Sequence, residues 1–419
     1  MKIKKYNFDV ILFFILITFM PLHNLVFSKI LGDIKILSLW RDAIILYLFV
    51  FSTKMKIRKN AMEIGIAISM AVILLFAVAS GSVSSYNIAR TYCIPLLIFF
   101  YTSRKKFLAR EFDAIVKIMV IIAIGVSIWG LVQAFIIGPE IMFKLGYSNA
   151  GGRFASTSFY INGWTQQRVI GTFSSPNGCG AYFACMLIFL FCVEDRIKNK
   201  YLFLGAFCII GLGLIGTFSR SAWIGCFIGI ICCGAIKIKK IKKKNFQILL
   251  IVIVFSLLLL IPLSETGMLS KMFAMVFSHI GKTVSREDAS FAYHLQQLYK
   301  PFFDLVGHPF GLGFGTNGSF ALGHLAVEET HQVESSIWVM AYELGMIGAL
   351  VYYFPYLYII LHFYKEKKDR IIRCAVGVCI CILLIYCCLP SVQSYEQPFY
   401  VMLFAGFAMK KSEEIQQRK

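Results

Sequence analysis

The stretch EETHQVESSIWVMAYELGMIG, residues 328–348, begins with polar and charged side chains and then enters an apolar run that continues to His362. A helix needs about 20 mostly apolar residues to cross the hydrocarbon core of a bilayer, and this run is long enough to do so. The stretch therefore predicts a membrane-spanning helix with His331 and Glu334 at its mouth.

The rest of the chain repeats this apolar pattern. It has 419 residues, of which 58% are hydrophobic and only 15% charged, a composition typical of a membrane protein and not of a soluble domain. We predict an all-α fold, a polytopic integral membrane helical bundle that forms a single membrane domain over residues 1–419, with about twelve transmembrane helices. The predicted spans are residues 8–27, 36–52, 61–80, 84–101, 115–137, 175–193, 201–217, 220–236, 246–263, 334–361, 372–390 and 393–409.

The net charge of +20 could suggest nucleic-acid binding, but its distribution along the chain argues against this. Most of the 42 Lys and Arg residues fall in the segments on one side of the predicted bundle, for example in KIKKIKKKN at 237–245. This is the bias of cytoplasmic loops toward positive charge, and it predicts that both termini are cytoplasmic. We expect the partner of the basic loops to be the lipid bilayer, with no nucleic acid.

Two predicted outer loops are long, residues 138–170 and 264–333. Both are rich in aromatic residues and poor in charge, unlike a disordered linker, so we expect them to be functional. In the second loop, 268–277 and 291–302 carry apolar residues at helical spacing. We predict that both form helices, lying at the membrane surface as interfacial helices or packing against the bundle.

Several polar residues are expected on the outer face. They are Arg153, Arg168, Arg220, Arg286, His331 and Glu334. Arg41 and Arg90 are the only other arginines expected there. An arginine near a membrane usually has an anionic partner, although a single one can instead extend from a helix end to the surface. For the group as a whole we favour binding of an anion, and a diphosphate suits the planar guanidinium fork.

His331 and Glu334 are three residues apart, so on a helical turn they would share a face. Either could accept a proton from an attacking hydroxyl, whereas the alternative is a purely structural histidine at a helix start. The chain has no Asp-x-Asp motif of the kind that holds a divalent metal in many glycosyltransferases. We therefore predict a site without metal and without a cofactor.

Four segments resemble, in order, the motifs of the O-antigen ligase and polymerase family. GTFSSPNGCGAYFA (171–184), preceded by Arg168, resembles its arginine and Pro-Asn signature, and Ser219–Arg220–Ser221 its Ser-Arg turn. HPFGLGFG (308–315) is similar to its glycine-rich loop, and THQVESSIWVMAYELGMIG (330–348) to its histidine and glutamate segment.

The resemblance implies a glycosyltransferase whose active site lies outside the bacterial cytoplasmic (inner) membrane. The donor would be a glycan on undecaprenyl diphosphate, the acceptor a second glycan, and a chain-length regulator protein a further partner. By the resemblance, Arg168 and Arg220 hold the diphosphate and His331 lies near the acceptor. A further family arginine has no direct counterpart, because Tyr293 and His294 occupy its place.

We assign His331, Arg220, Arg168 and Glu334 as catalytic, and Arg286, Arg153, Asn177 and His294 as substrate-binding. The predicted reaction is polymerisation of lipid-linked repeat units into O-antigen, capsular or exopolysaccharide. The closest alternative is a ligase that moves the glycan to another acceptor. An alternative of another class is a polysaccharide transporter or flippase, although transporters usually place their site near the membrane midplane.

Two features within these motifs have open interpretations. The glycines of residues 311–315 either let the backbone turn tightly or let it approach the glycan closely. Glu343 lies deeper in the predicted helix than Glu334, and we expect it to have a structural role there.

Overall fold

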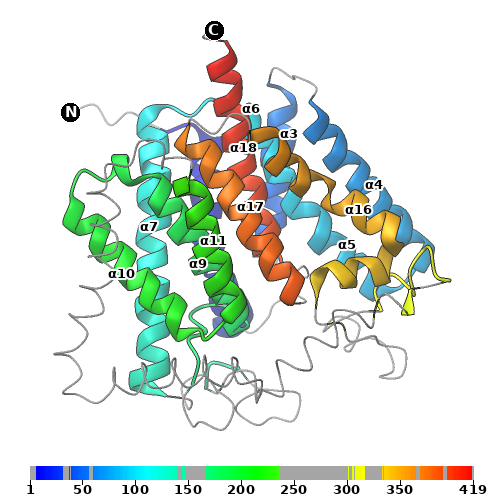
Figure 1. Ribbon diagram of the computed structural model, residues 1–419, viewed down its shortest axis with the longest axis horizontal. Helices are drawn as coiled ribbons and strands as arrows, with labels where there is room; N and C mark the ends of the chain where they lie inside the picture. Colours follow the sequence, from blue (N-terminus) through cyan, green and yellow to red (C-terminus); the bar gives the residue numbers. More distant parts are fainter. Residues whose placement is uncertain are drawn as a thin grey trace. The chain divides into compact units, whose positions relative to one another are not determined.

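The computed structural model shows a helical protein (Figure 1). It describes residues 6–31, 37, 39–55, 60–138, 144–147, 160, 167–235, 301, 304–305, 307–316, 333, 335–364, 369–389 and 394–417. The helices are α1 (Phe8–Phe19), η1 (Asn24–Ile30), α3 (Trp40–Thr53), α4 (Ala61–Ser80), α5 (Val83–Cys93), η2 (Ile94–Leu97), α6 (Ile98–Arg104), α7 (Ala109–Val132), η3 (Gln133–Ile137), α9 (Pro176–Cys192), η5 (Glu194–Arg196), α10 (Lys200–Gly216), α11 (Arg220–Ala235), α16 (Ser336–Tyr364), α17 (Arg370–Cys388) and α18 (Glu396–Gln416).

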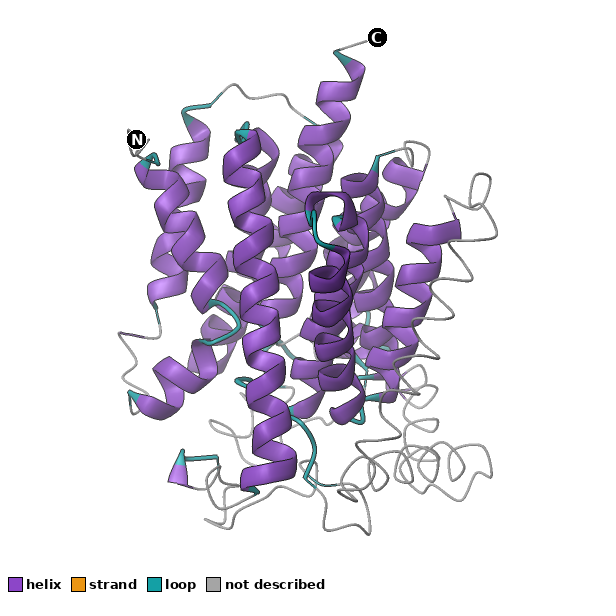
Figure 2. Ribbon diagram, turned by 90° about the vertical axis from the view of Figure 1, so that its left-hand side faces the viewer, coloured by secondary structure: helices purple, strands orange, loops and turns teal. Residues whose placement is uncertain are grey.

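The predicted all-α class is confirmed for this described part of the chain, which contains no strand (Figure 2). Within the described residues, four helical stretches are long and apolar enough to cross a membrane: Ala61–Ser80, Ala109–Ile137, Ser336–Phe363 and Arg370–Cys388. The protein is therefore membrane-spanning, and the total of about twelve spans stays a prediction. The predicted span 246–263 and the two interfacial helices lie outside the described residues.

The chain forms two compact units. The first comprises Met1–Met20, Leu39–Ile115 and Tyr293–Lys419. In this unit α18 packs against α17 and α6, and α16 packs against α17 and α4 (Figure 1). The second comprises Pro21–Ser38 and Val116–Ala292, and here α9 packs against both α10 and α11.

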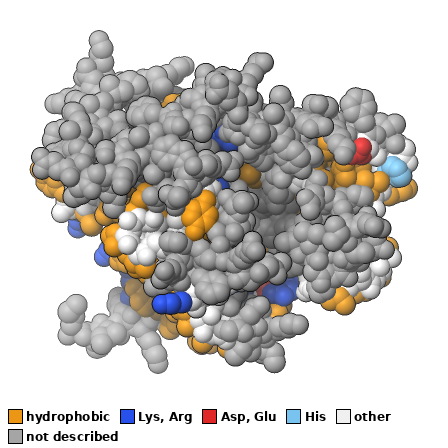
Figure 3. All heavy atoms as spheres, turned by 90° about the horizontal axis from the view of Figure 1, so that it is seen from below, with side chains coloured by type: hydrophobic (Ala, Val, Ile, Leu, Met, Phe, Trp, Pro, Cys, Tyr) orange, Lys and Arg blue, Asp and Glu red, His pale blue; other side chains and the backbone are white. Residues whose placement is uncertain are grey.

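The outer surfaces of the helices are apolar, as contact with lipid requires. Leu75 on α4 is 69% exposed, and Ile347 and Leu361 on α16 are 72% and 71% exposed. Seen from below in Figure 3, the described surface carries patches of hydrophobic side chains, with some charged ones between them. Such surfaces are stable in hydrocarbon and not in water.

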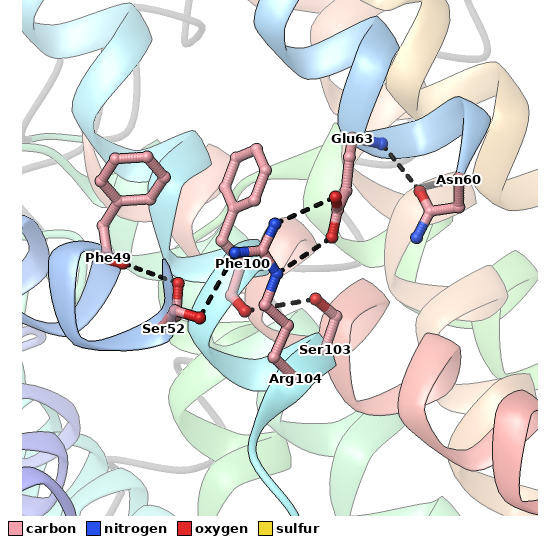
Figure 4. Close-up of polar contacts among 7 residues, drawn as sticks. All are labelled: Phe49, Ser52, Asn60, Glu63, Phe100, Ser103 and Arg104. Carbon is pink, nitrogen blue, oxygen red and sulfur yellow. Dashed lines mark hydrogen bonds and ion pairs between the residues drawn. The ribbon is translucent and has the colours of Figure 1, made fainter. Parts of the chain in front are cut away.

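Polar networks join helix ends within the first unit. Arg104, at the end of α6, donates hydrogen bonds from Nε and Nη2 to the two carboxylate oxygens of Glu63 at 3.2 and 3.0 Å (Figure 4). Its Nη1 lies 3.4 Å from the carbonyl oxygen of Ser52. Asn60 caps α4 by accepting from the backbone N–H of Glu63 at 2.8 Å. One ion pair thus ties together the ends of α3, α4 and α6.

Candidate active site

In the second unit, the N-termini of α9 and α11 lie at the same end of three successive antiparallel helices, α9, α10 and α11. Ser175 caps α9 by accepting from the N–H of Gly178 at 3.1 Å, and Pro176 follows at the first helical position, where its missing N–H costs nothing. Helix α10 runs back antiparallel, and α11 then begins with the bond from Trp223 N to Ser219 O at 3.0 Å. The N-termini of α9 and α11 therefore lie near the end of α10.

The turn between α10 and α11 is tight and strained. Phe218 is buried and has a φ of 51°, in the left-handed region that non-glycine residues rarely adopt. Its ring packs at 6.2 Å from that of Trp223, whose indole N–H donates to Leu214 O at 2.9 Å. These contacts hold the turn and so fix Arg220, the first residue of α11.

Arg168 is bonded to the same turn. Its Nε donates to the carbonyl oxygen of Thr217 at 2.7 Å, and its Nη2 donates to Oδ1 of Asn177 at 3.0 Å. The neighbouring backbone is fixed as well, because Val169 N donates to Gly216 O at 2.8 Å. Arg168 thus connects the start of α9 to the end of α10.

The two arginines are close enough to influence each other. Burial, and to a smaller extent the positive charge of Arg220, together lower the pKa of the Arg168 guanidinium from its ordinary value to about 10. A pKa of about 10 still leaves Arg168 protonated at neutral pH. The end of this unit therefore carries two adjacent positive charges.

This arrangement suits an anion. A helix N-terminus carries a partial positive charge and unbonded N–H groups, so two of them reinforce the two guanidinium groups. Guanidinium groups bind phosphate oxygens through paired hydrogen bonds. The arrangement is suited to binding an anion, and such binding stays a prediction. No described residues form a group able to hold a metal ion.

A further layer of contacts supports the Arg168 segment. Gln133, which is fully buried, accepts from the backbone N–H of Gly171 at 3.1 Å. The indole N–H of Trp129 donates to Gly171 O at 3.2 Å. Sequence reasoning did not find Gln133 or Thr217, because their roles depend on contacts with a distant segment and on no local motif.

Three of the predicted site residues are thus brought together: Arg168, Arg220 and Asn177. The described contact of Asn177 is with Arg168, and its assignment to substrate binding stays a prediction. The other predicted site residues lie outside the described part of the chain. They are His331, Glu334, Arg286, Arg153 and His294.

Helix α16, predicted to begin at Glu334, begins at Ser336. Its first turn is held by Ser336, whose N–H and hydroxyl donate to Leu389 O at 3.0 and 2.6 Å. The hydroxyl of Ser335 donates to Tyr386 O at 3.0 Å. The helical turn expected to carry His331 and Glu334 therefore precedes α16 and falls outside the described residues.

The glycine-rich loop packs against a break in α16. Gly345 has a φ of 72°, which interrupts the helix, and the carbonyl of Tyr342 accepts from Leu312 N at 2.6 Å. Gly311, with a φ of 82°, approaches Tyr342 so closely that a Cβ there would overlap its carbonyl oxygen. A Cβ at Gly345 would overlap Pro309 in the same way.

The other side of this loop packs against the start of α5. Ser80 and Ser85 donate to Phe314 O at 3.0 and 2.9 Å, and Ser84 donates to Gly315 O at 2.9 Å. A Cβ at Gly315 would lie 2.7 Å from the Ser85 hydroxyl oxygen. Gly311 and Gly315 thus allow close approach to the protein's own helices, while approach to a glycan stays a prediction.

Glu343 lies next to the α16 break and is fully buried. Its Oε2 accepts from the Tyr92 hydroxyl at 3.0 Å, and its Oε1 has no hydrogen-bond partner among the described residues. This contact joins α16 to α5.

Residues 204–353 match the family model described as O-antigen ligase. Over this segment the chain is similar to the O-antigen ligase family. The resemblance predicted from the sequence is confirmed, and the matched segment contains Arg220, the glycine-rich loop and Glu343. No curated protein matches the chain.

The O-antigen ligase family match indicates a membrane enzyme of the ligase or polymerase type, for which the lipid bilayer and a glycan are fitting partners. Arg168 and Asn177 precede the matched residues, and the structure places both beside the turn that carries Arg220. The anion site thus combines a matched turn with a segment before the match.

Proposed function

We propose that the protein is a glycosyltransferase of the cytoplasmic membrane that polymerises oligosaccharide repeat units carried on undecaprenyl diphosphate. The observation that carries the proposal is the pairing of Arg168 and Arg220 at the N-termini of α9 and α11, in a chain with an O-antigen ligase segment. A lipid diphosphate is an anion that would reach a protein at the membrane surface.

The chemistry follows from charge. A hydroxyl of the acceptor glycan attacks the anomeric carbon of the donor, the bond from that carbon to the diphosphate oxygen breaks, and the bonding electrons leave with the diphosphate. The growing negative charge on this leaving group is stabilised by the two fixed guanidinium groups, and loss of one such donor typically costs about 3–4 kcal/mol of activation free energy.

The hydroxyl proton needs an acceptor. We assign this role to His331, with Glu334 as its neighbour, from the sequence pattern at the mouth of α16. Arg286, Arg153 and His294 remain proposals for binding the sugar and phosphate groups on the same basis. We place the site on the extracytoplasmic side of the membrane and both termini in the cytoplasm. We expect the reaction to need no metal.

The decisive experiment uses the purified protein in liposomes with a lipid-linked repeat unit. We expect Arg168→Ala, Arg220→Ala and His331→Ala each to abolish the ladder of polymer products. The wild-type protein should form the same ladder with and without a chelator. Arg110→Ala is the matched control, because Arg110 is exposed and its described contact is with the ring face of Tyr6, at 5.4 Å. Normal ladders from all three variants would contradict the proposal.

Two other functions are separated by the same preparation. A ligase would transfer the glycan to a different acceptor, such as a lipid A core, and would give a single product and no ladder. A flippase would move the lipid-linked unit across the liposome membrane without forming a new glycosidic bond. We favour transfer over transport because the paired arginines lie at helix ends.

A further inference from the structure

The two arginine-bearing segments are joined by short contacts. Val169 N bonds to Gly216 O at 2.8 Å, and Arg168 Nε bonds to Thr217 O at 2.7 Å. Thr217 lies in the same turn as Arg220. Arg168 Nη2 also donates to Oδ1 of Asn177 in α9 at 3.0 Å, so the position of Arg168 relative to Arg220 depends on how closely α9 approaches this turn.

Helix α9 approaches the turn closely at Gly180. A Cβ at this position would lie 3.0 Å from the Cβ of Ala222 and from Oγ1 of Thr217, and 3.1 Å from the Cβ of Ser219. These distances are shorter than ordinary van der Waals contact, and Ala222 is fully buried. Glycine and alanine at this contact therefore allow a spacing that larger residues would prevent.

We propose that the contact between Gly180 and Ala222 sets the spacing of Arg168 and Arg220, and that both are positioning residues for binding of a diphosphate. The inference rests on the proposed function, because it deepens the role of the same anion site. Two like charges repel, so their spacing must be imposed by the surrounding fold.

The spacing matters for the choice of anion. A diphosphate offers two anionic groups, so each guanidinium can bind one of them through paired hydrogen bonds. A single phosphate would have to share its oxygens between both guanidinium groups. Small displacements of positioned groups lower binding and rate strongly, and a shift of about 1 Å can cost 100-fold.

The test measures binding of inorganic pyrophosphate and of orthophosphate to the purified full-length protein by calorimetry. We expect Gly180→Ala to weaken pyrophosphate binding by roughly tenfold, with a smaller effect on orthophosphate. Gly205→Ala is the matched control, because Gly205 also lies within a helix of the second unit and a Cβ there would meet nothing within 4 Å. The control should bind both anions as the wild type does.

A second substitution tests the contact itself. Ala222→Gly removes one of the atoms nearest to the new Cβ, so the double variant Gly180→Ala/Ala222→Gly should recover part of the lost pyrophosphate affinity. If Gly180→Ala does not purify as a folded protein, Ala222→Ser adds an oxygen atom to the opposite side of the same contact and should weaken pyrophosphate binding in its place.

The outcomes separate this inference from the proposed function. Wild-type affinity for pyrophosphate in Gly180→Ala, or in Ala222→Ser where that variant replaces it, would overturn the inference alone, provided that Arg168→Ala and Arg220→Ala lose binding. If neither arginine variant changes binding, the anion site itself is wrong, and the proposed function fails with it.

Discussion

Several arginines at helix ends have described partners within the protein. Arg41 lies 3.2 Å from Glu396, and Arg90 lies 2.5 Å from Asp42, so each is paired with a carboxylate of the first unit. Arg168 donates to the carbonyl oxygen of Thr217 and to the amide oxygen of Asn177. The sequence alone predicted an anionic partner for such residues. The contacts of each side chain in the structure are needed to tell a partner within the protein from a bound ligand.

The lowered pKa of Arg168 gives a prediction about stability. Because its folded-state pKa of about 10 lies below the unfolded-state value, protonation favours the unfolded chain, and the buried charge costs stability at any pH below about 10. The cost diminishes as the pH rises through 10. Arg168→Gln should therefore leave the midpoint of thermal unfolding at pH 7 unchanged or higher.

The same variant should lose stabilisation by an anion. Pyrophosphate at about 100 times its dissociation constant stabilises a protein that binds it by about 2.7 kcal/mol, so it should raise the wild-type unfolding temperature. It should leave that of Arg168→Gln unchanged. A clear drop in the unfolding temperature of the free variant would mean that Arg168 is mainly structural.

Two glutamates of the first unit should respond differently to replacement by glutamine. Glu63 is bonded to Arg104 through both oxygens, and both side chains are about one-tenth exposed. Glu63→Gln leaves this largely enclosed guanidinium without its charge partner and should lower the free energy of unfolding by about 3 kcal/mol. Glu343 has a tyrosine as its described partner, and a glutamine carbonyl oxygen can accept the same bond from Tyr92.

We therefore expect the free energy of unfolding of Glu343→Gln to lie within about 1 kcal/mol of the wild-type value. Chemical denaturation of both variants in the same detergent checks the pair. Equal losses would imply that Glu343 is also held by a positive charge.

At the scale of elements, hydropathy predicted the helices closely. Residues 61–80 were predicted as a span and form α4 with the same bounds, and 220–236 corresponds to α11. The predicted span 84–101 is instead three successive pieces, α5, η2 and α6, with Pro95 in the middle one. Hydropathy counts apolar residues, and it does not record where the backbone hydrogen-bond pattern changes.

The break in α16 shows what the sequence could not reveal. Gly345 is one glycine among many in apolar segments, and its positive φ becomes apparent only because the loop at Pro309 packs against it. The helical hydrogen bond lost at Tyr342 is replaced by one from Leu312, a residue distant in sequence. Such replacement is what allows irregular backbone within a membrane protein.

This contact gives a prediction at the same scale. Gly311→Ala places a Cβ against the Tyr342 carbonyl and requires a left-handed alanine, so it should destabilise the first unit by about 1–3 kcal/mol. Gly125→Ala is the control, because Gly125 lies in α7 with open space around it and should be neutral or stabilising by up to about 1 kcal/mol. Differential scanning fluorimetry compares the two variants. Equal midpoints of thermal unfolding would show that the loop can move away from the new Cβ without loss of stability.

At the scale of the whole molecule, the sequence predicted the class of protein better than its site. Composition established a membrane protein, and the order of four weak motifs indicated the family. Arg168, Asn177 and Arg220 could be named in advance because each lies in a motif, whereas Thr217 and Gln133 act through a backbone carbonyl and a buried amide that no motif marks. Long-range contacts of this kind require the fold.

Orientation in the membrane is the prediction on which the placement of the reaction depends. The excess of Lys and Arg in alternate loops predicts that residues 168, 220 and 331 all face the outside, and that the turn at Glu194–Arg196, between α9 and α10, faces the cytoplasm. Alkaline phosphatase, active only outside, should give activity when fused after Ser174 or Gln332 and none after Lys198. A fluorescent protein that matures only in the cytoplasm should show the reverse pattern. Because α9 alone separates Ser174 from Lys198, opposite signals at these two positions would establish that α9 crosses the bilayer. Signals that place residues 174 and 332 on opposite sides would separate His331 from the arginine pair, and a shared transfer site would then be impossible.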